Sequence, residues 1–184
     1  MPVQTPICDF GKKAIPFELK STDNKIISLD DIKGENGTLI MFICNHCPYL
    51  KAITKEIVED CNELKKIGIN SVAICSNDFI NYPEDSFDNM IKFSKDNQFS
   101  FPYLQDETQK IAKTYDAVCT PDFFGYDKDL GLQYRGRLRE LKNFIPVKDG
   151  ESDLLKAMKQ IAETGKGPQD QIPSAGCGIK WKYN

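Results

Sequence analysis

The sequence predicts an α/β fold in which a central mixed β-sheet is flanked by helices. Three observations support this prediction. Two apolar segments, 38–43 and 69–75, enclose the helical pattern of 48–67, an order that favours two parallel strands joined by a crossover helix. A hairpin pattern precedes this unit at 17–29, and a second hairpin pattern follows it at 118–138. Because hairpin strands pair antiparallel, the complete sheet is expected to be mixed.

The composition predicts one globular domain over residues 1–184. The chain is 40% hydrophobic and 28% charged, and its net charge of −3 comes from lysines scattered among acids. This distribution does not indicate a nucleic-acid surface. The longest apolar run, 39–43, is too short to span a bilayer, and the first residues lack the pattern of a secretory signal. We therefore expect a cytoplasmic protein with no nucleic-acid or membrane partner.

The first hairpin is predicted by alternating apolar and polar residues. Segment 17–20 alternates like an edge strand, Asp23 and Asn24 supply a turn, and segment 25–29 returns. This hairpin forms an N-terminal extension of the sheet. The run 38–43 that follows is continuously apolar, which is typical of a strand covered on both faces.

The helix at 48–67 is predicted by apolar positions at helical spacing, and Gly68 follows its last turn. Segment 69–75 is the second buried strand of the crossover unit. Further along the chain we expect a helix at 84–97, an extended piece at 101–104, a short helix at 107–115, antiparallel strands at 118–127 and 132–138, a helix at 152–164 and a C-terminal tail, rich in Gly and Pro, at 165–184.

The cysteines do not form the pattern of a secreted protein. There are seven, an odd number, at positions 8, 44, 47, 61, 75, 119 and 177. Most of them are therefore expected to be reduced. Cys61 and Cys75 are interpreted as buried small hydrophobic residues.

One cysteine pair stands out, in the run Cys44-Asn45-His46-Cys47-Pro48, where a predicted strand ends and a predicted helix begins. The first turn of a helix has free N–H groups and a positive dipole end, which lower the pKa of a nearby thiol. Pro48 suits an early helical position. We predict that Cys44, at the exposed end, attacks as the thiolate, that the more shielded Cys47 resolves the mixed disulfide, and that His46 tunes the pair.

Two other interpretations of this pair stay open. The first is a structural zinc site. Such a site normally needs four Cys or His ligands, and the chain offers no second pair at ligand spacing, so this interpretation is disfavoured and no metal is predicted. The two cysteines of the pair could also be there by chance and serve only for packing. No cofactor is predicted either.

With this pair in place, the sequence resembles the thioredoxin-like superfamily. The second feature of the resemblance is Thr120-Pro121, about 75 residues downstream at the head of a strand. The resemblance implies a cis-proline that faces the cysteine pair, with the backbone of the preceding residue pairing with the substrate chain. Thr120 and Pro121 are therefore the predicted substrate-binding residues.

A closer resemblance covers nearly the whole chain. The opening hairpin resembles the N-terminal extension of peroxiredoxins and of membrane-tethered thioredoxin-like reductases. The block 119–124, the strand 134–137 and the tail segment 173–182 resemble the small peroxiredoxin-like group of redoxins, within the alkyl hydroperoxide reductase/thiol-specific antioxidant superfamily. In that group Cys47 aligns with the peroxidatic cysteine. Ile40 and Cys44 stand where a peroxiredoxin has proline and threonine, and the peroxiredoxin arginine is absent near Thr120-Pro121. These departures imply weak activation of a bound peroxide.

Two further cysteines are possible auxiliary thiols. Cys119 directly precedes Thr120-Pro121, and Cys177 lies in a tail that could fold back over the site. Each of them also has the simpler interpretation of a small residue that fills space.

The sequence thus predicts an enzyme, a thiol–disulfide oxidoreductase that uses a redox-active Cys44–Cys47 disulfide. Its substrate would be a disulfide-containing protein or a small thiol compound, and its electrons would come from an external thiol. Two alternatives stay open: a peroxiredoxin-like thiol peroxidase with antioxidant activity, and a redox-sensing or binding module without turnover.

Overall fold

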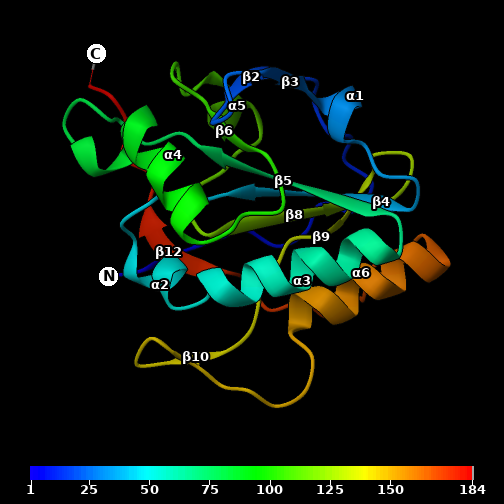
Figure 1. The fold of residues 1–184 in the computed structure, drawn as a ribbon. Coiled ribbons are helices and arrows are strands. Elements are labelled where there is room, and N and C mark those ends of the chain that lie inside the picture. Colours follow the sequence, from blue (N-terminus) through cyan, green and yellow to red (C-terminus); the bar gives the residue numbers. More distant parts are fainter. Residues whose placement is uncertain (184) are drawn as a thin grey trace.

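The computed structural model describes residues 1–183, and a seven-stranded mixed sheet forms its centre (Figure 1). The strand order is β3-β2-β6-β5-β4-β8-β9. The strands are β2 (Glu18–Ser21), β3 (Ile26–Ser28), β4 (Gly37–Phe42), β5 (Ile69–Cys75), β6 (Tyr103–Gln105), β8 (Asp122–Tyr126) and β9 (Leu132–Tyr134). The predicted α/β fold with a central mixed sheet is confirmed.

Strand β4 lies between a parallel and an antiparallel neighbour. Ile40 pairs with Val72 of β5 in parallel register, while Met41 pairs with Phe123 of β8 in antiparallel register. Every residue of β4 is buried, as expected for a strand covered on both faces. The parallel crossover and the antiparallel pairing of β8 with β9 are therefore both as the sequence predicts.

The helices cover the two faces of this sheet. They are α1 (Leu29–Ile32), α2 (Pro48–Lys51), α3 (Thr54–Lys66), α4 (Phe87–Asp96), α5 (Lys110–Thr114) and α6 (Asp153–Thr164), with a 3₁₀ turn η1 (Pro83–Asp85) before α4. Serine side chains cap three of them, since Ser28, Ser86 and Ser152 each accept a hydrogen bond from a first-turn N–H of α1, α4 and α6.

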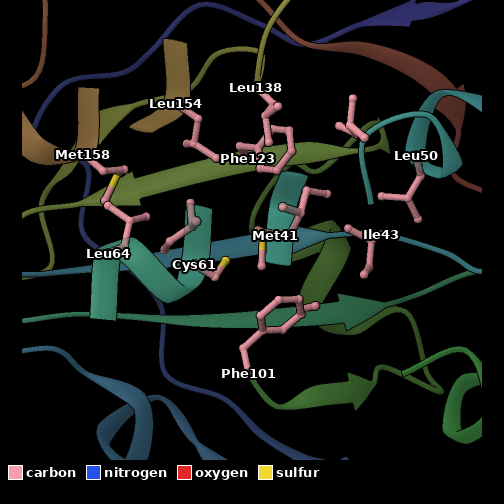
Figure 2. Packing of buried hydrophobic residues seen from close by; sticks show 14 of the residues in the cluster. Met41, Ile43, Leu50, Cys61, Leu64, Phe101, Phe123, Leu138, Leu154 and Met158 are labelled. Atoms are coloured by element: carbon pink, nitrogen blue, oxygen red, sulfur yellow. The ribbon is translucent and has the colours of Figure 1, made fainter. Parts of the chain in front are cut away.

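Two hydrophobic cores follow from the alternation of side chains along β4. Met41 points to the face covered by α3 and α6 and belongs to the same hydrophobic cluster as Cys61, Leu64 and Met158 (Figure 2). Phe42 points to the opposite face. The interpretation of Cys61 as a buried hydrophobic residue is confirmed, because it is 4% exposed in the first core.

Three local predictions are wrong. Strand β2 is internal, between β3 and β6, so β3 forms the edge. The helix expected at 48–67 is split into α2 and α3, because the Thr54 hydroxyl donates to the Leu50 carbonyl at 2.8 Å and takes the place of a helical N–H. The second strand of the hairpin ends at Tyr134 rather than at residue 138, because Arg135 turns to a buried carboxylate.

The C-terminal tail contains a strand that the sequence does not predict. Strand β12 (Ala175–Gly178) lies between β1 (Val3–Gln4) and β7 (Cys119–Thr120) in a small antiparallel sheet. A two-stranded hairpin of β10 (Leu141–Lys142) and β11 (Ile145–Pro146) completes the elements. No helix within residues 1–183 is both long and apolar enough to cross a bilayer.

Candidate active site

The cysteine pair lies where β4 leads into α2. Cys44 follows the strand by two residues, and Cys47 directly precedes α2, whose first residue is Pro48. Both cysteines are buried, with exposed fractions of 1% for Cys44 and 0% for Cys47. The prediction that Cys44 lies at an exposed end is therefore wrong: the segment turns inward into the core before the helix begins.

Thr120 faces both thiols. Its hydroxyl lies 3.2 Å from Cys44 Sγ, and its carbonyl oxygen lies 3.2 Å from Cys47 Sγ and accepts from that sulfur in its thiol form. The Thr120–Pro121 peptide bond is cis, as the resemblance implies. The two segments that were singled out in the sequence therefore meet, although more than 70 residues separate them.

The two thiols have opposite pKa shifts. A hydrogen bond from Cys44 lowers the pKa of Cys47 to about 5, helped by the thiol of Cys177 and by the backbone N–H groups of Leu50 and Cys177. The same hydrogen bond to Cys47, together with burial, raises the pKa of Cys44 well above its ordinary value. This pattern is opposite to the predicted one, in which Cys44 carries the thiolate.

The charge at Cys47 has a local origin. Helix α2 is only four residues long, so the dipole of a long helix, on which the sequence argument relied, does not stand behind Cys47. Neighbouring thiols and individual N–H groups stabilise the thiolate instead. Sequence patterns do not show such contacts in advance, since Cys177 is 130 residues from Cys47.

His46 lies beside a buried carboxylate. Its Nδ1 atom is 2.8 Å from Asp85 Oδ2, off the line of a hydrogen bond, and its side chain is 27% exposed. Asp85 also accepts from the backbone N–H of Asn45 at 2.7 Å and from Asn77 Nδ2 at 2.8 Å. Asp85, which sequence reasoning missed, thus fixes the backbone of Asn45 and lies beside the ring of His46.

Asn45 is anchored more firmly than His46, because hydrogen bonds hold both its backbone and its side chain. Its amide nitrogen donates to the Glu84 carbonyl at 3.0 Å, and its amide oxygen accepts from the Tyr103 hydroxyl at 2.8 Å. Together with Asp85, these contacts connect the turn between the cysteines to η1 and to β6. The backbone that carries both sulfurs is therefore held in one conformation.

Three potential metal ligands lie close together in this corner. The ligand atoms of Cys44, His46 and Asp85 all lie within 4.8 Å of one another, and each is of a type that zinc accepts. Both oxygens of Asp85 already accept hydrogen bonds, one from Asn45 and one from Asn77. We therefore interpret Asp85 as a fixed anion that orients the turn.

The tail brings Cys177 to the pair. In the register of β12 and β7, Cys177 lies opposite Thr120, and its Sγ atom is 2.9 Å from Cys47 Sγ. Cys119 is fully buried, and its thiol donates to the Pro121 carbonyl at 3.5 Å. Of the two predicted auxiliary thiols, Cys177 is thus the one that contacts the pair. Strand β12 also occupies the edge of Thr120 at which the resemblance places a substrate chain.

An ion pair is buried beside the site, at the start of β8. Arg135 Nη2 lies 2.9 Å from Asp122 Oδ2, and the two side chains are 7% and 0% exposed. Arg135 also donates to the Asp116 carbonyl at 2.8 Å, and its guanidinium lies 4.4 Å from the ring centre of Phe124. This arginine is thus committed to Asp122 and stabilises the end of the sheet.

The sheet, the cysteine pair before α2 and the cis-proline opposite them define a thioredoxin-like protein. A sequence model of the AhpC/TSA family matches residues 10–137. The chain belongs to the AhpC/TSA family, and this membership supports a redox function for its thioredoxin-like fold.

Solved structures share the fold. An uncharacterized conserved protein from Geobacillus kaustophilus is 42% identical, with 100% of this chain and 98% of that chain covered and a TM-score of 0.94. A hypothetical protein from Sinorhizobium meliloti 1021 is 30% identical, with full coverage of both chains and a TM-score of 0.91. The thioredoxin domain of a thiol-disulfide oxidoreductase from Bacteroides vulgatus shares the fold, at 15% identity, 68% and 86% coverage and a TM-score of 0.58. No curated protein matches the chain.

Proposed function

We propose that this protein is a thiol–disulfide oxidoreductase in which Cys44 and Cys47 form the redox-active pair. The observation that carries the proposal is that both thiols meet at Thr120, whose hydroxyl lies 3.2 Å from Cys44 Sγ and whose carbonyl oxygen lies 3.2 Å from Cys47 Sγ. The lowered pKa of Cys47 and the raised pKa of Cys44 support it. A thiolate beside a protonated thiol is the arrangement that thiol–disulfide exchange needs, because one sulfur attacks while the other holds its proton until its turn.

The proposed reaction assigns the nucleophile to Cys47. Its thiolate attacks one sulfur of a disulfide, a new S–S bond forms, and the other sulfur leaves as a thiolate. Cys44 then gives up its proton to the departing thiol and attacks Cys47 Sγ, so that a Cys44–Cys47 disulfide forms and the second thiol leaves. Two electrons pass to the substrate, and an external thiol returns them in the reverse sequence.

Three other residues have proposed supporting functions. The Thr120 hydroxyl, 3.2 Å from Cys44 Sγ, donates to that sulfur when it becomes a thiolate. Asp85 and His46 hold the turn between the two cysteines. Disulfide-containing proteins and small disulfides are the proposed substrates.

A single domain over 1–184 and a cytoplasmic location stay predictions.

The test is a redox titration of the purified protein in glutathione buffers, with the thiols alkylated and mapped by mass spectrometry. We expect a Cys44–Cys47 disulfide that forms reversibly and that is lost in Cys44→Ser and in Cys47→Ser. Cys61→Ser is the matched control, since this buried thiol lies on α3 and not in the turn that carries the pair. Failure of Cys44 and Cys47 to form a disulfide at any glutathione ratio would disprove the proposal.

Peroxide reduction is a second candidate, favoured by family membership and by the lowered pKa of Cys47. In this reaction the Cys47 thiolate attacks the peroxide O–O bond, becomes a sulfenic acid and releases water or an alcohol. Cys44 then attacks the sulfenic sulfur, so that a Cys44–Cys47 disulfide forms and the sulfenic oxygen leaves as water. The buried Arg135 is engaged with Asp122 and does not polarise a peroxide at Cys47. Consumption of hydrogen peroxide with a thiol donor, compared with the rate of disulfide exchange, separates the two activities.

A further inference from the structure

The C-terminal strand is built into the site. Ser174, just before β12, donates from its hydroxyl to the Pro121 carbonyl at 2.8 Å, and its own carbonyl accepts from the Thr5 N–H at 2.9 Å. Beyond the strand, the Lys180 N–H donates to Asn77 Oδ1 at 2.9 Å, and the Lys180 carbonyl accepts from Gln109 Nε2 at 2.8 Å. The position of β12 is therefore fixed on both sides of Cys177.

A glycine allows the close approach of this strand. A side chain on Gly176 would collide with the backbone of Thr120, whereas one on Gly178 would only make an ordinary contact with Val3. The glycine next to Cys177 thus lets β12 lie directly against the residue that faces both thiols. As a result Cys177 Sγ comes within 2.9 Å of Cys47 Sγ, compared with about 2.0 Å for a disulfide bond.

The three sulfurs differ in access. Cys44 and Cys47 are 1% and 0% exposed, so a thiol or disulfide from solution has no direct approach to either of them in this conformation. Cys177 is partly exposed and touches Cys47. Disulfide exchange requires that the attacking thiolate reach the sulfur it attacks. By access, the thiol in the tail is the member of the trio that meets this requirement. Burial and the hydrogen bond to Cys47 raise the pKa of Cys177 to about 12 in the reduced protein, and the second of these effects is absent once Cys47 is in a disulfide.

We infer that Cys177 is a third redox-active thiol, which exchanges with the Cys44–Cys47 disulfide and is the sulfur at which external thiols and disulfides react. This inference rests on the proposed function and refines its first step: the disulfide that the Cys47 thiolate attacks is the mixed disulfide that an external substrate forms with Cys177. Two contacts place this thiol at the site: its Sγ atom lies 2.9 Å from Cys47 Sγ, and Cys177 pairs with Thr120 across the two strands.

The relay is balanced at each step. The Cys177 thiolate attacks Cys47 Sγ of the Cys44–Cys47 disulfide, so the 44–47 bond breaks, a 47–177 bond forms, and Cys44 takes up the proton that Cys177 lost. An external thiolate then attacks Cys177 Sγ, and Cys47 leaves. A second external thiol attacks the mixed disulfide, giving the oxidised external disulfide and a free Cys177. Of the two sulfurs in the Cys47–Cys177 disulfide, Cys47 is the better leaving group, because a thiol of lower pKa departs faster.

The first experiment asks whether the new disulfide forms. Cys44→Ser is treated with oxidised glutathione, alkylated, digested and mapped by mass spectrometry. We expect an intramolecular Cys47–Cys177 disulfide, with Cys8→Ser in the same background as a control, since Cys8 is a partly exposed thiol outside the site. A stable glutathione adduct on Cys47, with Cys177 still reduced, would overturn the inference.

The second experiment asks whether the tail thiol carries the exchange. In Cys177→Ser and Cys177→Ala, the rate at which glutathione reduces the oxidised protein is expected to fall about tenfold or more, while the Cys44–Cys47 disulfide still forms at equilibrium. Equal rates in both variants and in the wild type would disprove a relay and leave the proposed function intact. Absence of a Cys44–Cys47 disulfide in the wild type would instead disprove the proposed function, and the relay with it, because the relay needs that disulfide.

Discussion

Asp85 Oδ2 lies 2.8 Å from His46 Nδ1, and the same carboxylate accepts a hydrogen bond from the backbone N–H of Asn45 at 2.7 Å. A buried acid from the turn before α4 thus fixes one of the two residues that separate the cysteines and lies beside the other. The pKa of Cys44 is raised mainly by its hydrogen bond to Cys47 and by burial. The negative charge of Asp85, which lies nearby, raises it further.

The first prediction concerns this charge. Asp85→Asn is expected to lower the pKa of Cys44, because it removes a negative charge that disfavours the thiolate. The measurement is a pH titration of the Cys44 Cβ chemical shift in labelled protein. Asp88→Asn serves as the control, since Asp88 is exposed on α4. A pKa of Cys44 that is unchanged or higher in Asp85→Asn would contradict the electrostatic argument.

The second prediction concerns the thiolate. Cys44→Ala is expected to raise the pKa of Cys47 from about 5 towards its ordinary value of about 8.5, because the largest stabilising hydrogen bond is lost. Cys44→Ser keeps a donor at this position and is expected to raise it less. The ultraviolet absorbance of the thiolate, followed against pH, measures both variants. An equal pKa of Cys47 in Cys44→Ala and Cys44→Ser would show that the hydrogen bond from position 44 does not stabilise the thiolate.

Sequence reasoning predicted the parts of this protein that depend on local patterns. The buried strands 38–43 and 69–75, the crossover between them and the position of Cys44 and Cys47 follow from runs and spacings within about 40 residues. The meeting of the pair with Thr120-Pro121 came from a family resemblance. The pairing of β12 was not predicted, because Ala-Gly-Cys-Gly has no alternating pattern and is placed by tertiary contacts.

The electrostatics of the site were the least predictable feature. The assignment of the thiolate depends on which sulfur receives hydrogen bonds, and these come from Cys177 and from backbone N–H groups as well as from Cys44. Asp85 lies 40 residues from Asn45 in a segment with no motif. Long-range contacts of this kind are decided by packing, so a linear sequence with one histidine and seven cysteines leaves several assignments open.

The third prediction tests the close approach of the tail. Gly176→Ala is expected to push β12 away from Thr120, reduce the yield of the Cys47–Cys177 disulfide in a Cys44→Ser background and cost about 1–3 kcal/mol of stability. Gly178→Ala is the matched control in the same strand, because its new methyl group meets only Val3 at an ordinary distance. Mass mapping and urea unfolding give the two readouts. Equal disulfide yields in the two variants would rule out the proposed steric requirement.

The fourth prediction concerns the buried ion pair. Arg135→Leu is expected to destabilise the fold by about 3–5 kcal/mol, because it leaves the carboxylate of Asp122 buried without its partner. Arg137→Leu, which removes a more exposed pair with Asp153, is expected to cost only about 0–1 kcal/mol. Urea unfolding measures both. Similar losses of unfolding free energy in Arg135→Leu and Arg137→Leu would show that burial of the ion pair does not determine the cost of removing the arginine.

The fifth prediction is a pH dependence of stability. Burial raises the pKa of Asp60 from 3.8 to about 6, against the lowering effect of a hydrogen bond from Ser152. Since the folded pKa is the higher one, the folded state favours the protonated acid. This contribution is fully present below pH 3.8 and is lost as the pH rises through about 6.

Asp60→Asn is therefore expected to change the free energy of unfolding by different amounts at the two ends of this range. Compared with the wild type, the variant should gain about 1–2 kcal/mol between pH 4 and pH 7, a figure that allows for partial solvent screening. Asn offers an oxygen for the Ser152 hydroxyl but carries no charge to desolvate. Urea unfolding at several pH values measures the difference, with Asp88→Asn as an exposed control. Parallel pH profiles of Asp60→Asn and the wild type would mean that Asp60 ionises equally easily in the folded and unfolded chains.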